Sequence, residues 1–158
     1  MKTVFKILVT SVIVLFSACK AKTNTTARIL RSDKPFSISL ERTPCFGTCP
    51  VYKVEIHSDG RIQYNGKEFS NPKGNYETFI PLDEVELLRR AIIEARFLNL
   101  EDVYDNMYIS DLPSAITTLT VNGKQIKTVK NRYNPPPQLV KLEVFIDSLW
   151  RKELEAKE

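Results

Sequence analysis

Two cysteines lie in a stretch bracketed by prolines, Pro44-Cys45-Phe46-Gly47-Thr48-Cys49-Pro50. This stretch interrupts strand-like sequence. Before it, Phe36 to Arg42 alternates apolar and polar residues, and after it, Tyr52 to His57 does the same. A period of two is typical of a strand with one buried face. The pattern therefore predicts a stiffened loop between two strands, and it limits the chain to folds built on a sheet.

The next turn, Ser58-Asp59-Gly60, leads into a further alternating run from Arg61 to Gly66. A three-residue turn with Gly60 in the left-handed conformation pairs Ile56 with Ile62, whereas a two-residue turn would mix the faces. We therefore expect the three-residue turn. A further strand is predicted from Gly74 to Ile80.

Asn122-Gly123 separates two β-rich runs, Ile116 to Val121 and Lys124 to Val129. Asn-Gly between such runs is a strong hairpin signal. A two-residue turn followed by regular antiparallel pairing would place Leu119 opposite Ile126 and Thr117 opposite Thr128.

Apolar residues recur at helical spacing in two places. One helix is predicted to start at Asp83, with Asp83 as N-cap and Glu86 three residues on, and to run to about Arg96. A second runs from about Gln138 to Lys152. Hairpin-linked strands with separate helices indicate an α+β fold: an antiparallel β-sheet of about five to six strands with two amphipathic helices packed on one face.

The N-terminus resembles a lipoprotein signal peptide. A mostly apolar run from Ile7 to Phe16 is too short to span a membrane. It ends in Leu15-Phe16-Ser17-Ala18-Cys19, which resembles a bacterial lipobox although Phe16 stands where the family prefers leucine. The resemblance implies cleavage after residue 18 and acylation of Cys19, for example with palmitate. The lipid membrane would then be a partner of the mature chain.

Three segments follow from this interpretation: a signal peptide over residues 1–18, a flexible tether over 19–34, and a single domain over 35–154. We expect a lipid-anchored protein of the bacterial cell envelope, on the periplasmic face of the outer membrane. Without Lys2 and Lys6, 21 basic side chains face 19 acidic ones. A mature charge of about +2 argues against nucleic acid as a partner.

Three interpretations of Cys45 and Cys49 remain open. A local disulfide would stabilise the fold by about 2 kcal/mol, because the loop it closes is short. A thiol-redox role usually needs two cysteines with two residues between them at a helix N-terminus, and here the spacing is one longer and a strand follows. Cys-x-x-x-Cys-Pro also resembles the motif of periplasmic copper-insertion proteins, and the resemblance implies copper handling, although that family also needs a distant histidine and a thioredoxin-like βαβ frame that this sequence does not show. His57 is expected on the polar face of its strand, paired with Arg61, so we predict no metal site.

No set of residues in the sequence predicts catalysis, so we expect no enzyme activity and no cofactor. The acids Asp102, Asp105 and Asp111 lack the calcium-loop pattern. Tyr104 and Tyr108 are expected to pack over a sheet edge. A binding or envelope-structural role is therefore expected, with an unknown protein as partner. An alternative is an inhibitor-like module that presents the loop to a periplasmic enzyme. The possible binding surface comprises Arg42, Phe46, Tyr104 and Asp111.

The stretch from Glu41 to Tyr52 also resembles a family of exported bacterial proteins, domain of unknown function 6438. The likeness continues through Ser58-Asp59-Gly60, Phe97 to Tyr104 and Asp111-Leu112-Pro113, and it covers most of residues 36–150. The resemblance implies a shared fold and a structural role for the cysteine motif, and it implies no reaction.

Overall fold

The computed structural model describes residues 24–31 and 33–155, so Cys19 lies outside the described residues. The helices are α2 (Thr25–Ile29), α3 (Leu82–Glu94) and α4 (Pro137–Glu155), with a short 3-10 helix, η1 (Phe97–Asn99). The strands are β1 (Phe36–Arg42), β2 (Tyr52–His57), β3 (Arg61–Gly66), β4 (Gly74–Phe79), β5 (Val103–Tyr104), β6 (Ala115–Val121) and β7 (Lys124–Asn131). No helix in this described part of the chain has the length and apolar character needed to cross a membrane.

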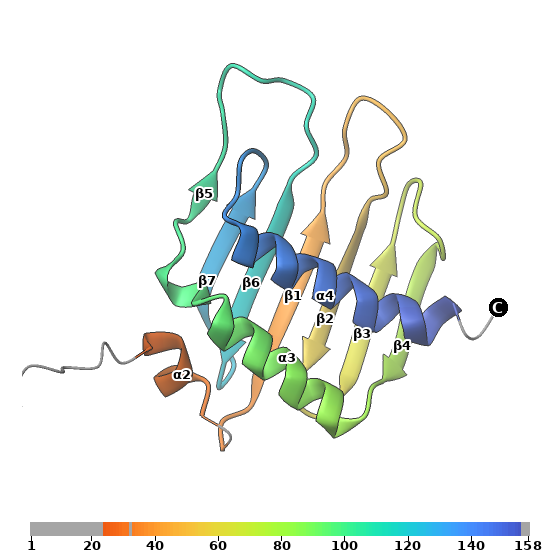
Figure 1. Cartoon of the computed structure of the whole chain (residues 1–158). Helices are drawn as coiled ribbons and strands as arrows, with labels where there is room; N and C mark the ends of the chain where they lie inside the picture. Colours follow the sequence, from red (N-terminus) through yellow and green to blue (C-terminus); the bar gives the residue numbers. More distant parts are fainter. Residues whose placement is uncertain (1–23, 32, 156–158) are drawn as a thin grey trace, which may run out of the picture.

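The predicted α+β class is confirmed, and Figure 1 shows a single sheet with α3 and α4 on the same face. The sheet has seven strands in the order β4-β3-β2-β1-β6-β7-β5, so the expected five to six is too few. The additional strand is β5, which has two residues and pairs with β7 in parallel. So short a strand leaves no alternating pattern in the sequence, and the sheet is antiparallel everywhere else.

The predicted turn between β2 and β3 is confirmed. Ile56 pairs with Ile62 and Val54 with Tyr64, so the apolar side chains of both strands share one face. Gly60 adopts a φ of +89°, and a Cβ there would lie 2.4 Å from the carbonyl oxygen of Ile80. Glycine is therefore required at this turn both by backbone conformation and by space.

The predicted register between β6 and β7 is wrong beyond the turn. Val121 pairs with Lys124 across a two-residue turn, as expected, but a β-bulge follows. The bulge places Lys127 opposite Leu119 and Val129 opposite Thr117. Ile126 is consequently 37% exposed, whereas Val129 is fully buried. One extra residue in β7 exchanges the faces of every residue after it.

The core lies between the sheet and the two long helices. Its largest fully buried side chains come from the sheet, from α3 and α4, and from the segments at α2 and η1: Trp150, Phe97, Leu30, Ile38, Leu40, Ile56, Ile62, Leu88, Ile92, Leu119, Leu139 and Leu142. Helix α3 begins one residue before the predicted N-cap, at Leu82, and Pro81 takes the cap position without a side-chain hydrogen bond. Asp83 instead lies in the first turn, where its negative charge interacts favourably with the positive end of the helix dipole.

Helix α2 lies within the segment predicted to be a flexible tether, and this finding differs from that prediction. Asn24 caps the helix by accepting hydrogen bonds from the backbone N–H groups of Thr26 and Ala27. Its amide also donates to the carbonyl oxygen of Ile93, at 2.9 Å. Leu30 is buried, and Arg89 donates to its carbonyl oxygen. The folded part of the chain therefore begins before residue 35.

The connections of the sheet divide between its two ends (Figure 1). The loops β1–β2, β3–β4, β5–β6 and β7–α4 lie at one end, which we call the loop end. Helix α2 and the turns β2–β3 and β6–β7 lie at the opposite end. The cysteine motif and the point where the described chain begins are thus at opposite ends of the domain.

Candidate functional site: a braced loop over a polar cluster

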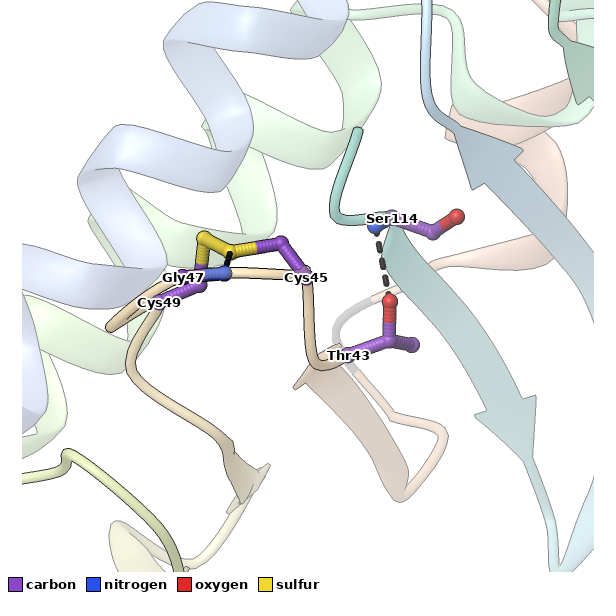
Figure 2. The surroundings of a disulfide bond; sticks show 5 residues. All are labelled: Thr43, Cys45, Gly47, Cys49 and Ser114. Carbon is purple, nitrogen blue, oxygen red and sulfur yellow. Dashed lines mark hydrogen bonds between the residues drawn. A yellow bond between two sulfur atoms is a disulfide. The ribbon is translucent and has the colours of Figure 1, made fainter. Parts of the chain in front are cut away.

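The cysteine motif forms the β1–β2 connection, residues 43–51, which we call the disulfide loop. Cys45 and Cys49 are bonded, with 5.7 Å between their Cα atoms (Figure 2). The backbone N–H of Gly47 donates a hydrogen bond to Cys45 Sγ, at 3.3 Å. The structure therefore contains the disulfide that was one of the three interpretations of this pair. The bond closes the tip of the loop.

Both ends of the disulfide loop are held by neighbouring loops. Thr43 and Ser114 exchange two hydrogen bonds. The Thr43 N–H donates to the Ser114 carbonyl oxygen at 3.0 Å. The Ser114 N–H donates to Thr43 Oγ1 at 2.8 Å, the bond that Figure 2 shows. At the other end, the Val51 N–H donates to the Glu68 carbonyl oxygen, and the Val51 carbonyl oxygen accepts from Lys67. The loop is thus fixed to its neighbours on both sides.

A polar cluster lies beneath the disulfide loop, on the helix face of the sheet. Arg42 ends β1 and Tyr52 begins β2, and both bind Asp147 of α4. Arg42 Nη2 lies 2.7 Å from Asp147 Oδ2, and the Tyr52 hydroxyl donates to Asp147 Oδ1 at 2.6 Å. The indole N–H of Trp150 also donates to Oδ1, at 3.2 Å. One carboxylate therefore joins both strands flanking the loop to the helix.

A second acid of α4, Glu143, lies deeper in the same cluster. Its side chain is 3% exposed, and its nearest Arg42 nitrogen is 3.9 Å away. It accepts hydrogen bonds from Asn131 at 2.8 Å and from the Thr117 hydroxyl at 3.4 Å. Strands β1, β2, β6 and β7 all reach α4 through these two acids, Glu143 and Asp147.

Burial and charge shift the titration of three members of this cluster. Burial, helped by the hydrogen bond to Asp147, raises the pKa of Tyr52 to about 12. Burial also raises the pKa of Glu143, although its bond with Asn131 and the charge of Arg42 oppose this shift. Burial disfavours the charged form of Arg42, but the charge of Asp147 and its hydrogen bond outweigh it and raise the pKa of Arg42. The cluster is built to keep Arg42 charged and Tyr52 neutral.

The outer surface of the disulfide loop borders a shallow hollow at the loop end. The hollow has a volume of about 370 Å³ and is lined by Pro44, Cys45, Phe46, Asp111 and Leu112. Phe46 is 92% exposed, and Leu112 beside it is 37% exposed. The loop therefore presents an aromatic ring to solvent while its base is held rigidly by the polar cluster.

The four residues predicted as a binding surface do not form one cleft. Phe46 and Asp111 line the same hollow. Arg42 is held in the polar cluster, and Tyr104 lines a separate hollow of about 680 Å³ beside Met107 and Tyr133. The sequence predicts that these residues lie in or beside loops. Which of them are neighbours depends on contacts between the loops, and the sequence does not specify those contacts.

Two further expectations are corrected. Tyr104 is half-buried at the sheet edge as predicted, but Tyr108 is 89% exposed and does not pack there. His57 lies 3.3 Å from Gln63 and 3.8 Å from Glu55 rather than against Arg61. Arg61 turns instead toward Glu77, at 3.8 Å. Among the residues that the structure describes, no group of three His, Cys, Asp or Glu side chains could hold a metal ion.

Sequence reasoning missed Glu143 and Asp147, although the sequence holds a signal for the first. Leu139, Leu142 and Ile146 form the buried stripe of α4, and Glu143 is four residues after Leu139 and three before Ile146. An acid at a core-facing position of an amphipathic helix requires buried partners. That signal could have predicted the cluster, but not which strand residues complete it.

The fold and its braced loop define a small α+β domain that presents a disulfide-closed hairpin connection at one end of its sheet. A family model described as Domain of unknown function (DUF6438) matches residues 36–150, and the chain belongs to this family. No curated protein is significantly similar to the chain.

Proposed function

We propose that this protein is a lipoprotein of the bacterial cell envelope that binds a protein partner through the disulfide loop and catalyses no reaction. The observation that carries the proposal is the contrast between Phe46 and its support. Phe46 is 92% exposed, on a loop that is closed by a disulfide and bonded to Ser114 and Glu68. Burial of a phenylalanine side chain contributes about 1.5–3 kcal/mol, and a rigid loop loses little entropy on binding.

The proposed anchor is Cys19, acylated after removal of residues 1–18, on the periplasmic face of the outer membrane. Four residues lie between Cys19 and Asn24, which caps α2, so the Cα atoms of Cys19 and Asn24 are at most about 18 Å apart. Because α2 lies opposite the loop end (Figure 1), an anchored domain would direct the disulfide loop away from the membrane. Such an orientation favours a periplasmic partner, which includes the enzyme that an inhibitor-like module would bind.

The anchor is tested by labelling cells with a fatty acid that carries a detectable group. We expect incorporation into the native chain and none into a Cys19→Ala variant, which should leave the membrane fraction. A Cys19→Ala protein that remains membrane-bound would refute the anchor.

The binding role is tested by placing a photo-crosslinking amino acid at Phe46 in cells. The matched control places it at Leu87, which is 51% exposed on α3, away from the loop end. We expect a discrete crosslinked product from position 46 and none of the same mass from position 87. Equal yields of one product at both positions would contradict a binding surface centred on the disulfide loop.

The second candidate is a thiol-redox or copper-handling role for Cys45 and Cys49. The hydrogen bond from the Gly47 N–H to Cys45 Sγ favours it, because such a bond would stabilise a thiolate on Cys45 after reduction. Thiol titration of the folded protein separates the two candidates. A structural disulfide releases no thiol at this pair until the protein is reduced under denaturing conditions, whereas a redox pair is readily reduced in the folded state. Stoichiometric copper binding would favour the copper-handling alternative.

A further inference from the structure

Strand β4 forms one edge of the sheet, and its outer side is not covered by any strand of the described residues. It lies at the end of the sheet opposite β5 (Figure 1), and it pairs with β3 in an unbroken register from Gly66↔Gly74 to Arg61↔Phe79. No other strand of the described residues pairs with it. The backbone groups on its outer side therefore have no partner in the sheet.

The hydrogen bonds at the end of β4 identify these groups. The Ile80 N–H donates to the carbonyl oxygen of Gly60, so Ile80 directs its backbone toward β3. Antiparallel strands alternate the direction of successive residues. Asn75, Glu77 and Phe79 consequently direct their N–H and C=O groups to the outer edge, and all three residues are exposed.

The opposite edge of the sheet is protected, whereas the β4 edge is not. Strand β7 carries three lysines, a β-bulge and the covering strand β5. Lysines, bulges, prolines and covering elements are the devices by which proteins prevent pairing with another chain. Between Gly74 and Phe79 there is no lysine, no proline and no bulge. One edge of the sheet therefore carries features that prevent strand pairing, whereas the six residues of β4 at the other edge carry none of them.

We propose that the β4 edge binds an extended segment of another polypeptide, which adds to the sheet as an eighth strand. A second copy of this chain fits less well. The one antiparallel register in which all three outward residues face those of a copy places Glu77 opposite its own counterpart, and like charges directly opposite destabilise a sheet. A segment with a lysine or arginine opposite Glu77 meets a carboxylate that is half exposed and that has Arg61 at 3.8 Å on its β3 side.

The side chains on the helix face of the sheet indicate which residues the segment would carry on that face. Tyr76 is 42% exposed on this face, with its ring 6.3 Å from that of Tyr64, on which Trp150 stacks at 4.4 Å. Helix α4 crosses β3 and reaches the β4 edge there (Figure 1). Residues of the segment on either side of its basic residue face Tyr76 and α4, so apolar side chains fit these positions. The recognised pattern is apolar–basic–apolar in extended conformation.

The test uses the full chain in detergent, labelled with nitrogen-15, and two capped peptides. One is Val-Thr-Val-Lys-Val-Thr-Val, and the other has glutamate in place of lysine. With saturating lysine peptide, we expect amide hydrogen exchange at Asn75, Glu77 and Phe79 to slow at least tenfold. We expect the glutamate peptide to bind about threefold more weakly.

Two variants separate backbone pairing from charge. Glu77→Pro removes one outward N–H while leaving the inward bonds of β4 in place, so it should abolish the protection. Glu77→Ala should keep the protection and bind the two peptides equally. Unchanged exchange at the three amides, or slowing at β7 instead, would overturn the proposal. Protection without peptide that disappears on dilution would show that a second copy occupies the edge, and would overturn the assignment to another polypeptide.

Discussion

Replacing Asp147 by alanine tests whether the polar cluster holds the base of the disulfide loop. The change removes the acceptor of three donors: the Arg42 guanidinium, the Tyr52 hydroxyl and the Trp150 indole N–H. Arg42 is 28% exposed in its side chain and can be hydrated, whereas Tyr52 and Trp150 are 3% and 1% exposed. Their two donors would lose their partner with little access to water.

Leaving a buried donor without a partner costs about 1–3 kcal/mol. Two such donors give an expected loss of about 2–6 kcal/mol in the free energy of unfolding, to which the hydrated Arg42 adds little. Asp147→Asn keeps one oxygen acceptor and removes the charge, so its loss should be smaller, about 1–2 kcal/mol.

Urea titration measures this loss, and Trp150 is the only tryptophan, so its fluorescence reports on the cluster itself. Circular dichroism provides a second signal, because the substitution changes the surroundings of Trp150. The control is Glu101→Ala, an exposed acid that should change stability by less than about 0.5 kcal/mol. A loss below about 1 kcal/mol for Asp147→Ala would show that the cluster does not hold the loop.

Three further predictions concern the same region. Replacing Cys45 and Cys49 together by serine should lower the free energy of unfolding by about 2 kcal/mol in urea, because the disulfide closes a short loop. Folding raises the pKa of Tyr52 from 10.0 to about 12, so the unfolded state loses its proton first. Stability should therefore fall between about pH 10 and pH 12, and denaturation across this range should show a shallower fall for Tyr52→Phe. Folding also raises the pKa of Glu143, so stability should fall as the pH rises above the ordinary value of 4.5, and Glu143→Gln should remove this fall in the same measurement.

Local chemistry explains which parts of the fold the sequence predicts. Gly60 can adopt a positive φ, and only one turn length keeps Ile56 and Ile62 on the same face, so the β2–β3 register follows from the residues alone. The β6–β7 hairpin has an equally clear turn, but its bulge depends on whether Ile126 or Val129 fits the core. Packing against the helices decides that question, and the alternating pattern does not contain it.

The sequence likewise predicts one part of the candidate site, the disulfide loop, and does not predict the other, the polar cluster. The motif predicts the disulfide loop, because two cysteines and two prolines lie within seven residues. The cluster beneath the loop joins Arg42 to Asp147, which are 105 residues apart. Such a contact depends on where α4 crosses the sheet, and neither periodicity nor spacing specifies the crossing. Strand β5 is not predicted for a related reason: its two residues form a strand only through their pairing with β7, and no local pattern specifies that pairing.

The central claim is that the disulfide serves by holding the shape of a binding loop. Crosslinking from position 46 tests this most directly when it is measured in the native chain and in the variant with both Cys45 and Cys49 replaced by serine. With the variant shown to be folded by Trp150 fluorescence, we predict that its crosslinking yield falls several-fold, because Phe46 is then no longer held by a closed loop. An unchanged yield in the folded variant would contradict the claim.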